Sequence, residues 1–233
     1  MGVNMAGNCI CDDAVCCEAS RQEIVRRYYD SLNSLLKGNS PEEEAQKIEL
    51  LMNQANVTIE DRHVVAAALK RAEETHTPAA ALELDDGRII TGKTTNLLGA
   101  SAALLLNVIK ELAGLKHELH IISPESIEPI QKLKVDYLKS KNPRLHTDEV
   151  LIALLQALPP TDARLALQQL SKLNGCQAHT SVMLSDVDIR TFKRLGVQLH
   201  VKLSMRPDII TIKSDPLLMG EDFFNKRGNI YCS

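Results

Sequence analysis

The sequence contains no tryptophan and few other aromatic residues, only four tyrosines and three phenylalanines in 233 residues. Base-stacking platforms for single-stranded nucleic acids depend on such rings, so their scarcity argues against that class of protein. A basic excess is missing as well, because the formal net charge is −3 and the isoelectric point is about 6.2. We therefore expect neither a nucleic acid nor an anionic membrane surface as a partner.

Long apolar runs are also missing. The longest candidate, Leu97–Leu106, is interrupted by Gly99 and Ser101, which excludes a simple membrane span. No signal peptide precedes the first predicted helix, so we expect a cytoplasmic location. The hydrophobic fraction of 44% and the charged fraction of 24% are ordinary for globular proteins. At this length the chain has room for one large domain or two small ones.

The sequence gives no convincing metal or cofactor signal. Four of the six cysteines form a C-x-C-x₄-C-C cluster, which is not a usual zinc spacing, and we interpret them as reduced, small apolar residues. His117 and His120 are three residues apart on a predicted strand, where they point to opposite faces. The cysteines are Cys9, Cys11, Cys16 and Cys17 in the cluster, with Cys176 and Cys232 apart from it.

The predicted organisation has three parts: a helical region over residues 1–75, an α/β domain over residues 76–203, and tail or edge elements over residues 204–233. Apolar residues at helical spacing and cap residues define helices in the first part. The second part begins with a hairpin and continues with alternating helices and strands. The predicted strands are Ala79–Leu84, Arg88–Thr91, Glu118–Ile122, Ala178–Leu184 and Val197–Val201, and the helices between them start near Asn96, Ile127, Thr147, Thr161 and Asp186.

This order of elements resembles an α/β three-layer sandwich of cytidine-deaminase-like topology, preceded by a helical region. Zinc deaminases need a histidine and cysteines at the starts of two helices of that fold. The corresponding helix starts in this chain read Asn96-Leu97-Leu98-Gly99 and Pro124-Glu125-Ser126-Ile127. Zinc deamination is therefore excluded, and the topological resemblance implies no chemistry.

The segment Gly87–Thr94 matches the phosphate-loop pattern G-x-x-x-x-G-K-[ST] at every position. An alternative interpretation makes Asp85-Asp86-Gly87 a hairpin turn, with a strand returning from Arg88. We favour the hairpin, because Ile89 and Ile90 suit a strand and disfavour a phosphate cradle. In addition, no later strand ends directly in a carboxylate that would hold Mg²⁺.

Several long blocks resemble one bacterial family, known as domain of unknown function 1846. The blocks Thr91–Ala103, Ile122–Ile130 and Asn142–Val150 carry the resemblance, which runs from about Gly2 to Val201. The family has no established activity, so the resemblance implies relationship but no reaction. Its members are typically about twice this length, and the chain looks like their C-terminal half.

Two groups of polar residues are candidates for a binding or active site. The first lies at a predicted helix start, where unpaired N–H donors and the helix dipole favour an anion. The second places an imidazole beside carboxylates, which suits acid–base chemistry near neutral pH. The ligand-binding candidates are Lys93, Thr94, Thr95, Asn96, Ser101, Arg144 and His179, and the catalytic candidates are His146, Asp148 and Glu149.

These features lead to one main hypothesis on function and two alternatives. The main hypothesis is a domain that binds a small anionic ligand within a larger, enzymatic, cytoplasmic bacterial protein. The first alternative is a non-catalytic half that assembles with a missing N-terminal domain. The second is a nucleotide hydrolase that uses Gly87–Thr94 as a phosphate loop. As protein partners we expect a second copy of the chain or the missing N-terminal half.

Overall fold

The computed structural model describes residues 13–36, 38–157 and 160–201. All of them belong to the first of two compact units, Met1–Leu203, and the second unit, Ser204–Ser233, lies outside the described residues. Cys9, Cys11, Cys232 and the predicted tail also lie outside them. The division into a helical region, an α/β domain and a tail stays a prediction.

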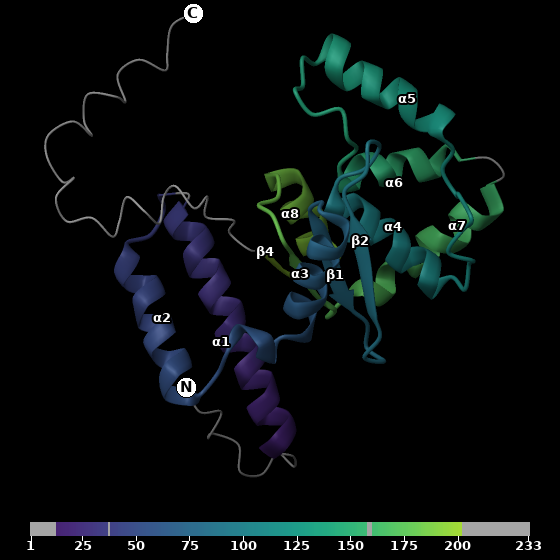
Figure 1. Cartoon of the computed structure of the whole chain (residues 1–233). Coiled ribbons are helices and arrows are strands. Elements are labelled where there is room, and N and C mark those ends of the chain that lie inside the picture. Colours follow the sequence, from purple (N-terminus) through teal and green to yellow (C-terminus); the bar gives the residue numbers. More distant parts are fainter. Residues whose placement is uncertain (1–12, 37, 158–159, 202–233) are drawn as a thin grey trace, which may run out of the picture. The chain divides into compact units, whose positions relative to one another are not determined.

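The helices predicted for the first part of the chain are present (Figure 1). They are α1 (Asp13–Leu36), α2 (Glu42–Ala55) and α3 (His63–Thr75), with a short 3₁₀ turn, η1 (Ile59–Asp61), before α3. Buried side chains from these helices and from the connection between α2 and α3 form one apolar cluster: Val25, Tyr29, Met52, Val57 and Val65.

A mixed sheet of four strands forms the centre of the α/β part. Its strands are β1 (Ala79–Glu83), β2 (Ile89–Lys93), β3 (Gln177–Thr180) and β4 (Gln198–Val201), in the order β2-β1-β3-β4. Strand β1 is antiparallel to β2 and to β3, whereas β3 and β4 are parallel. Strands β2, β3 and β4 therefore run in the same direction, and their carboxyl ends lie at one edge of the sheet.

The predicted hairpin between β1 and β2 is confirmed. Leu82 pairs with Ile90, and the N–H of Leu84 donates to the carbonyl of Arg88. Gly87 occupies the turn with φ of +81°, a region that glycine adopts without steric cost. Because Gly87–Lys93 forms this turn and strand, the segment does not have the geometry of a phosphate-binding loop.

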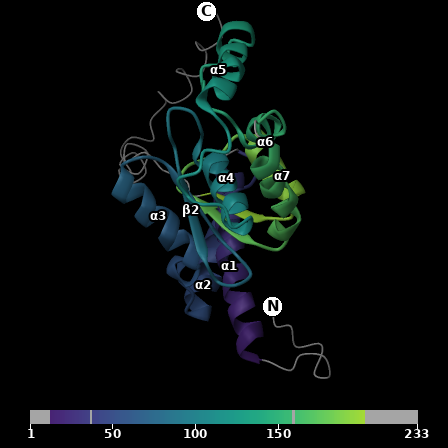
Figure 2. The ribbon, with the colours of Figure 1, turned by 90° about the vertical axis from the view of Figure 1, so that its right-hand side faces the viewer.

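Helices lie on both faces of the sheet, and Figure 2 shows α3 and α4 on opposite sides of β2. Ala81 of β1 packs with Val64 and Ala68 of α3. Ala80 and Leu82 point to the other face, where the main core is formed. The helices on that side are α4 (Ala100–Leu112), α5 (Pro124–Lys132), α6 (Thr147–Leu155), α7 (Pro160–Gln168) and α8 (Asp186–Arg194).

The predicted strand Glu118–Ile122 is wrong, because this segment is an irregular connection between α4 and α5. The carbonyls of His117 and Leu119 accept hydrogen bonds from the ammonium group of Lys110, both at 2.6 Å, and are thus held by a helix side chain. The mixed α/β class is confirmed. The deaminase-like topology is not confirmed, since the sheet has four strands and the segment Glu118–Ile122 is outside it.

Three helices, α4, α5 and α7, differ from prediction at their ends. Helix α4 starts at Ala100 because Thr95 closes a turn over Leu97 and Leu98, whose N–H groups donate to its hydroxyl oxygen. Helix α5 starts at Pro124 and passes into a π-helical turn, η2 (Leu133–Tyr137), while α7 passes into a 3₁₀ turn, η3 (Gln169–Leu173). Within the described ranges, no helix has the length and apolarity needed to cross a bilayer.

Candidate functional site

Three connections meet at the sheet edge where β2, β3 and β4 end. The first leads from β2 to α4, the second from β3 to α8, and the third enters α6. Two backbone hydrogen bonds join the first connection to the third. The N–H of Leu145 donates to the carbonyl of Leu97 at 2.9 Å, and the N–H of Gly99 donates to the carbonyl of Leu145 at 3.2 Å. Ligand sites in α/β proteins commonly lie outside such carboxyl ends.

Arg144 fixes the same contact from its side chain. Its Nε donates to the backbone carbonyl of Thr95 at 2.7 Å. In the described part of the chain, no hydrogen bond or ion pair involves its two terminal nitrogens, so they are available to a ligand. The structure thus brings together two of the predicted ligand-binding residues, Thr95 and Arg144, although the hydroxyl oxygen of Thr95 already serves the turn that precedes α4.

His146 forms an imidazole–carboxylate pair with Asp188. The Nδ1 atom of His146 and Oδ2 of Asp188 are 2.9 Å apart, and the other carboxylate oxygen, Oδ1, accepts the N–H of Thr147 at 2.9 Å. Ser185, the N-cap of α8, donates its hydroxyl to Oδ2 at 2.7 Å. The imidazole is therefore oriented by a carboxylate that is itself held by two further donors.

Hydrogen bonding between His146 and Asp188 shifts the pKa values of the two groups in opposite directions. The Asp188 side chain is only 5% exposed, and burial opposes its ionisation, but His146, Ser185 and the N–H of Thr147 outweigh it and lower the pKa of Asp188 to about 2. The hydrogen bond to Asp188 raises the pKa of His146 above its ordinary value, against the effects of burial and of Lys134. His146 is 26% exposed, so its imidazole is accessible at this edge of the sheet.

The carboxylates next to His146 in the sequence have structural partners. Glu149 accepts the N–H of His146 at 2.7 Å and the ammonium of Lys134 at 2.8 Å, and Lys134 also donates to the carbonyl of Arg144. Asp148 accepts the N–H of Glu149. These contacts cap α6 and fix the preceding loop. The carboxylate that hydrogen-bonds the imidazole of His146 is therefore Asp188, and the charge of Glu149 adds a smaller effect on its pKa.

The three helices that begin at this edge differ in their caps. Ser185 caps α8, and Asp188 and Glu149 occupy donors at the start of α6. Helix α4 has no side-chain cap, because its N-cap residue is Gly99. Its first residues, Ala100, Ser101 and Ala102, are buried, at 4%, 2% and 0% exposure. The first N–H groups of a helix have no partner within it, so this N-terminus favours an anion.

The structure separates the remaining predicted residues. Lys93 ends β2 and lines a groove to which His146 does not contribute. Thr94 is half-buried and continues the hairpin, with its N–H bonded to the carbonyl of Pro78, and Asn96 is exposed. His179 is fully buried in β3, where its ring centroid is 4.8 Å from that of Tyr29 on α1. It belongs to the interface between α1 and the sheet.

Sequence reasoning missed Asp188, and it placed the start of α4 near Asn96 rather than at Ala100. Asp188 is 42 residues from His146, and only the fold brings the two together. A signal was present, because Ser185-Asp186-Val187-Asp188 has the form of a capping box at a helix start. Among the described residues, no group of three or more His, Cys, Asp or Glu is arranged to hold a metal ion. Cys16, Cys17 and Cys176 are free thiols.

Two family descriptions match the chain. "Domain of unknown function DUF1846, C-terminal" matches residues 60–204, and "Domain of unknown function DUF1846, N-terminal" matches residues 1–56. The resemblance inferred from the sequence blocks is thereby confirmed. The prediction that the chain corresponds to the C-terminal half alone is wrong, since the match includes the N-terminal description.

Curated relatives carry the name UPF0371 protein. One from Corynebacterium urealyticum is 54% identical over 198 residues, which is 84% of this chain and 40% of that protein. One from Streptococcus uberis is 48% identical over 200 residues, 85% of this chain and 40% of that protein. One from Corynebacterium diphtheriae is 45% identical over 228 residues, 97% of this chain and 43% of that protein. The chain thus spans less than half the length of these relatives.

Proposed function

Since the chain belongs to the DUF1846 family, whose descriptions assign no reaction, we propose its function from the geometry: it binds a small anionic ligand at the carboxyl edge of the sheet. The observation that carries the proposal is the uncapped, buried start of α4, which is hydrogen-bonded to the loop bearing Arg144 and His146. In this proposal, the backbone donors of α4, the guanidinium of Arg144 and the imidazole of His146 face one bound anion. Phosphate or carboxylate groups fit such a set of donors.

His146 gives this site a proton-transfer group as well. A carboxylate that orients an imidazole and stabilises its charged form is a recurrent arrangement in acid–base catalysis. No hydrogen bond in the described part of the chain occupies Nε2 of His146, so this atom is the one that would exchange a proton with a ligand. We propose that, within the longer protein, His146 protonates or deprotonates the bound anion, with Asp188 as its positioning residue.

The experiment is a thermal-shift titration with phosphate and with small dicarboxylates at constant ionic strength. A ligand that binds only the folded protein raises the melting temperature by mass action. We expect the rise to be larger at pH 6 than at pH 8, because the affinity falls as pH rises through the raised pKa of His146. Replacing His146 by Gln, or Arg144 by Gln, should remove most of the rise.

Matched controls use residues that lie outside the cluster. His63→Gln changes a histidine whose side chain is 66% exposed, and Arg164→Gln changes an exposed arginine on α7. Both should keep the response of the unmodified protein. An anion response that is equal in His146→Gln and His63→Gln would show that the ligand binds elsewhere, and the proposal would then be abandoned.

A further inference from the structure

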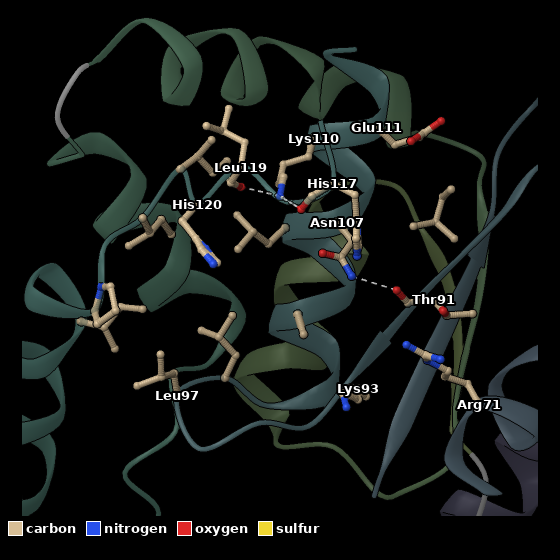
Figure 3. Close-up of a pocket in the computed structure, with 18 of the residues that line it drawn as sticks. Arg71, Thr91, Lys93, Leu97, Asn107, Lys110, Glu111, His117, Leu119 and His120 are labelled. Atoms are coloured by element: carbon tan, nitrogen blue, oxygen red, sulfur yellow. Dashed lines mark hydrogen bonds between the residues drawn. The ribbon is translucent and has the colours of Figure 1, made fainter. Parts of the chain in front are cut away.

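A groove of about 620 Å³ runs along the free edge of β2, separate from the cluster around His146. Its walls come from β2, from α4, from the connection 117–122 and from the start of α5 (Figure 3). We call it the β2 groove. Its volume is within the range of small-molecule sites, roughly 300–1,000 Å³. Much of its lining is apolar, including Ile89, Ile90, Leu106, Ile121, Ile122 and Ile127.

Positive charge exceeds negative charge in the polar lining of the β2 groove. Three cationic side chains and two histidines line it, whereas the acidic residue in its lining, Glu111, is already paired with Arg88. The basic residues are Arg71, Lys93, Lys110, His117 and His120, and of these Arg71 reaches a carboxylate, that of Glu74, at 3.5 Å. An apolar groove with an excess of positive charge is complementary to an organic anion.

Lys110 is the most informative of these residues. It is only 7% exposed, and its ammonium group donates to the carbonyls of His117 and Leu119 at 2.6 Å each (Figure 3). An ammonium group carries three N–H bonds, so one remains. No ion pair among the described residues includes Lys110. Burial lowers the pKa of Lys110, and the negative charge of Glu118 opposes this shift with a smaller effect. A buried ammonium group that contacts no carboxylate is costly, and a ligand carboxylate in direct contact would relieve that cost.

The hydrogen-bonding groups on the free edge of β2 help to decide whether the groove binds a small molecule or an added β-strand. The antiparallel register directs the backbone N–H and C=O groups of Ile89, Thr91 and Lys93 away from β1. The central carbonyl, that of Thr91, accepts a hydrogen bond from the side-chain amide of Asn107 at 2.9 Å. Because a side chain already occupies the middle of this edge, a small molecule fits the groove better than an added strand.

We propose that the β2 groove binds a small amphipathic acid, with its aliphatic or aromatic body against the isoleucine and leucine side chains and its carboxylate beside Lys110. This site shares no residue with the His146–Asp188 pair. The two proposals therefore stand or fall independently.

Calorimetric titration with octanoate, 1-octanol and acetate tests the β2 groove. Octanoate should bind. The affinities of 1-octanol and of acetate should be lower by about tenfold or more, because 1-octanol lacks the carboxylate and acetate lacks the apolar chain. In Lys110→Met, octanoate should weaken about tenfold while 1-octanol is unchanged. Lys47→Met, which changes an exposed lysine on α2, should leave octanoate binding unchanged.

Methyl-resolved NMR of the unmodified protein keeps the test independent of how well Lys110→Met folds. Octanoate should shift the methyl signals of Ile89, Ile90, Ile121 and Ile127, which line the β2 groove. Equal binding of octanoate and octanol, or shifts confined to other methyl groups, would overturn the proposal. So would saturation by a neutral extended peptide, such as acetyl-Val-Thr-Val-Thr-amide, without any response to octanoate, because that result would assign the groove to strand addition.

Discussion

Replacing Gly92 by alanine is expected to destabilise the fold by about 3 kcal/mol or more, at or beyond the upper end of overpacking effects. A methyl group on Gly92 would lie 2.2 Å from the nitrogen of Leu104, 2.5 Å from its Cα and 2.8 Å from the carbonyl carbon of Ala103. These are backbone atoms of α4, so no flexible side chain can move aside. Urea unfolding measures the loss.

Gly87→Ala is the matched control, because it changes the other glycine of the phosphate-loop pattern. Gly87 has φ of +81° and no atom within 4 Å of an added methyl group. Its replacement should cost only the strain of a left-handed backbone, roughly 1–2 kcal/mol. If Gly92→Ala lowered the free energy of unfolding no more than Gly87→Ala does, β2 would not approach α4 as closely as the structure shows. The fold therefore explains why glycine occupies both positions, without any role in nucleotide binding.

Acid is expected to weaken the fold through His200. This residue is 2% exposed on β4, beside His179 of β3 in the sheet register. Burial, followed by the positive charge of Arg62 and the neighbouring His179 and Arg26, lowers the pKa of His200 to about 2. Arg62 is itself 1% exposed and bonds to the carbonyls of Gln22 and Gln198 at 3.4 and 3.3 Å, linking α1 to β4.

The sign of the effect follows from proton binding in the two states. Between pH 6.5 and 2 the unfolded chain protonates His200 and the folded chain does not, so the stability contributed by the neutral imidazole is complete above about pH 6.5 and falls as pH falls. The expected loss between pH 7 and pH 5 is on the order of 2 kcal/mol. His146, whose pKa is raised, contributes in the opposite direction over part of this range.

The comparison that isolates His200 is therefore between variants. Urea unfolding of the unmodified protein and of His200→Gln at pH 7, 6 and 5 should show a steeper pH dependence in the unmodified protein. His120→Gln, which changes an exposed histidine, should retain the steep dependence. Parallel curves for the unmodified protein and His200→Gln would contradict the assignment of a buried neutral imidazole.

Elements that are stabilised by residues close in the sequence were predicted correctly, whereas an element whose contacts come from other parts of the chain was not. The hairpin was predictable, because Asp86-Gly87 sets the turn and Ile89 and Ile90 favour a strand. The segment Glu118–Ile122 was predicted wrongly, since its apolar content suits a strand while the contacts that hold its carbonyls come from Lys110, on a helix. Strand pairing depends on such distant partners, which periodicity does not reveal.

The same distinction applies to the candidate site. His146 and Arg144 were identified from the sequence because charged residues cluster at one predicted helix start. Asp188 was missed, since no local pattern connects it with His146, and Asp148 and Glu149 were preferred only for being adjacent. The β2 groove was missed for a similar reason: its basic residues are dispersed from α3 to the connection before α5, and the fold alone gathers them.

An NMR titration of the His146 imidazole tests the central claim most directly, with His63, an exposed histidine, as an internal reference. We expect a pKa of His146 above its ordinary value, a lower pKa in Asp188→Asn, and a further rise when phosphate or a dicarboxylate is added to the unmodified protein. A pKa at or below the ordinary value, unchanged by Asp188→Asn and by every anion tested, would contradict the proposal that His146 and Asp188 form the ligand-binding, proton-transferring pair.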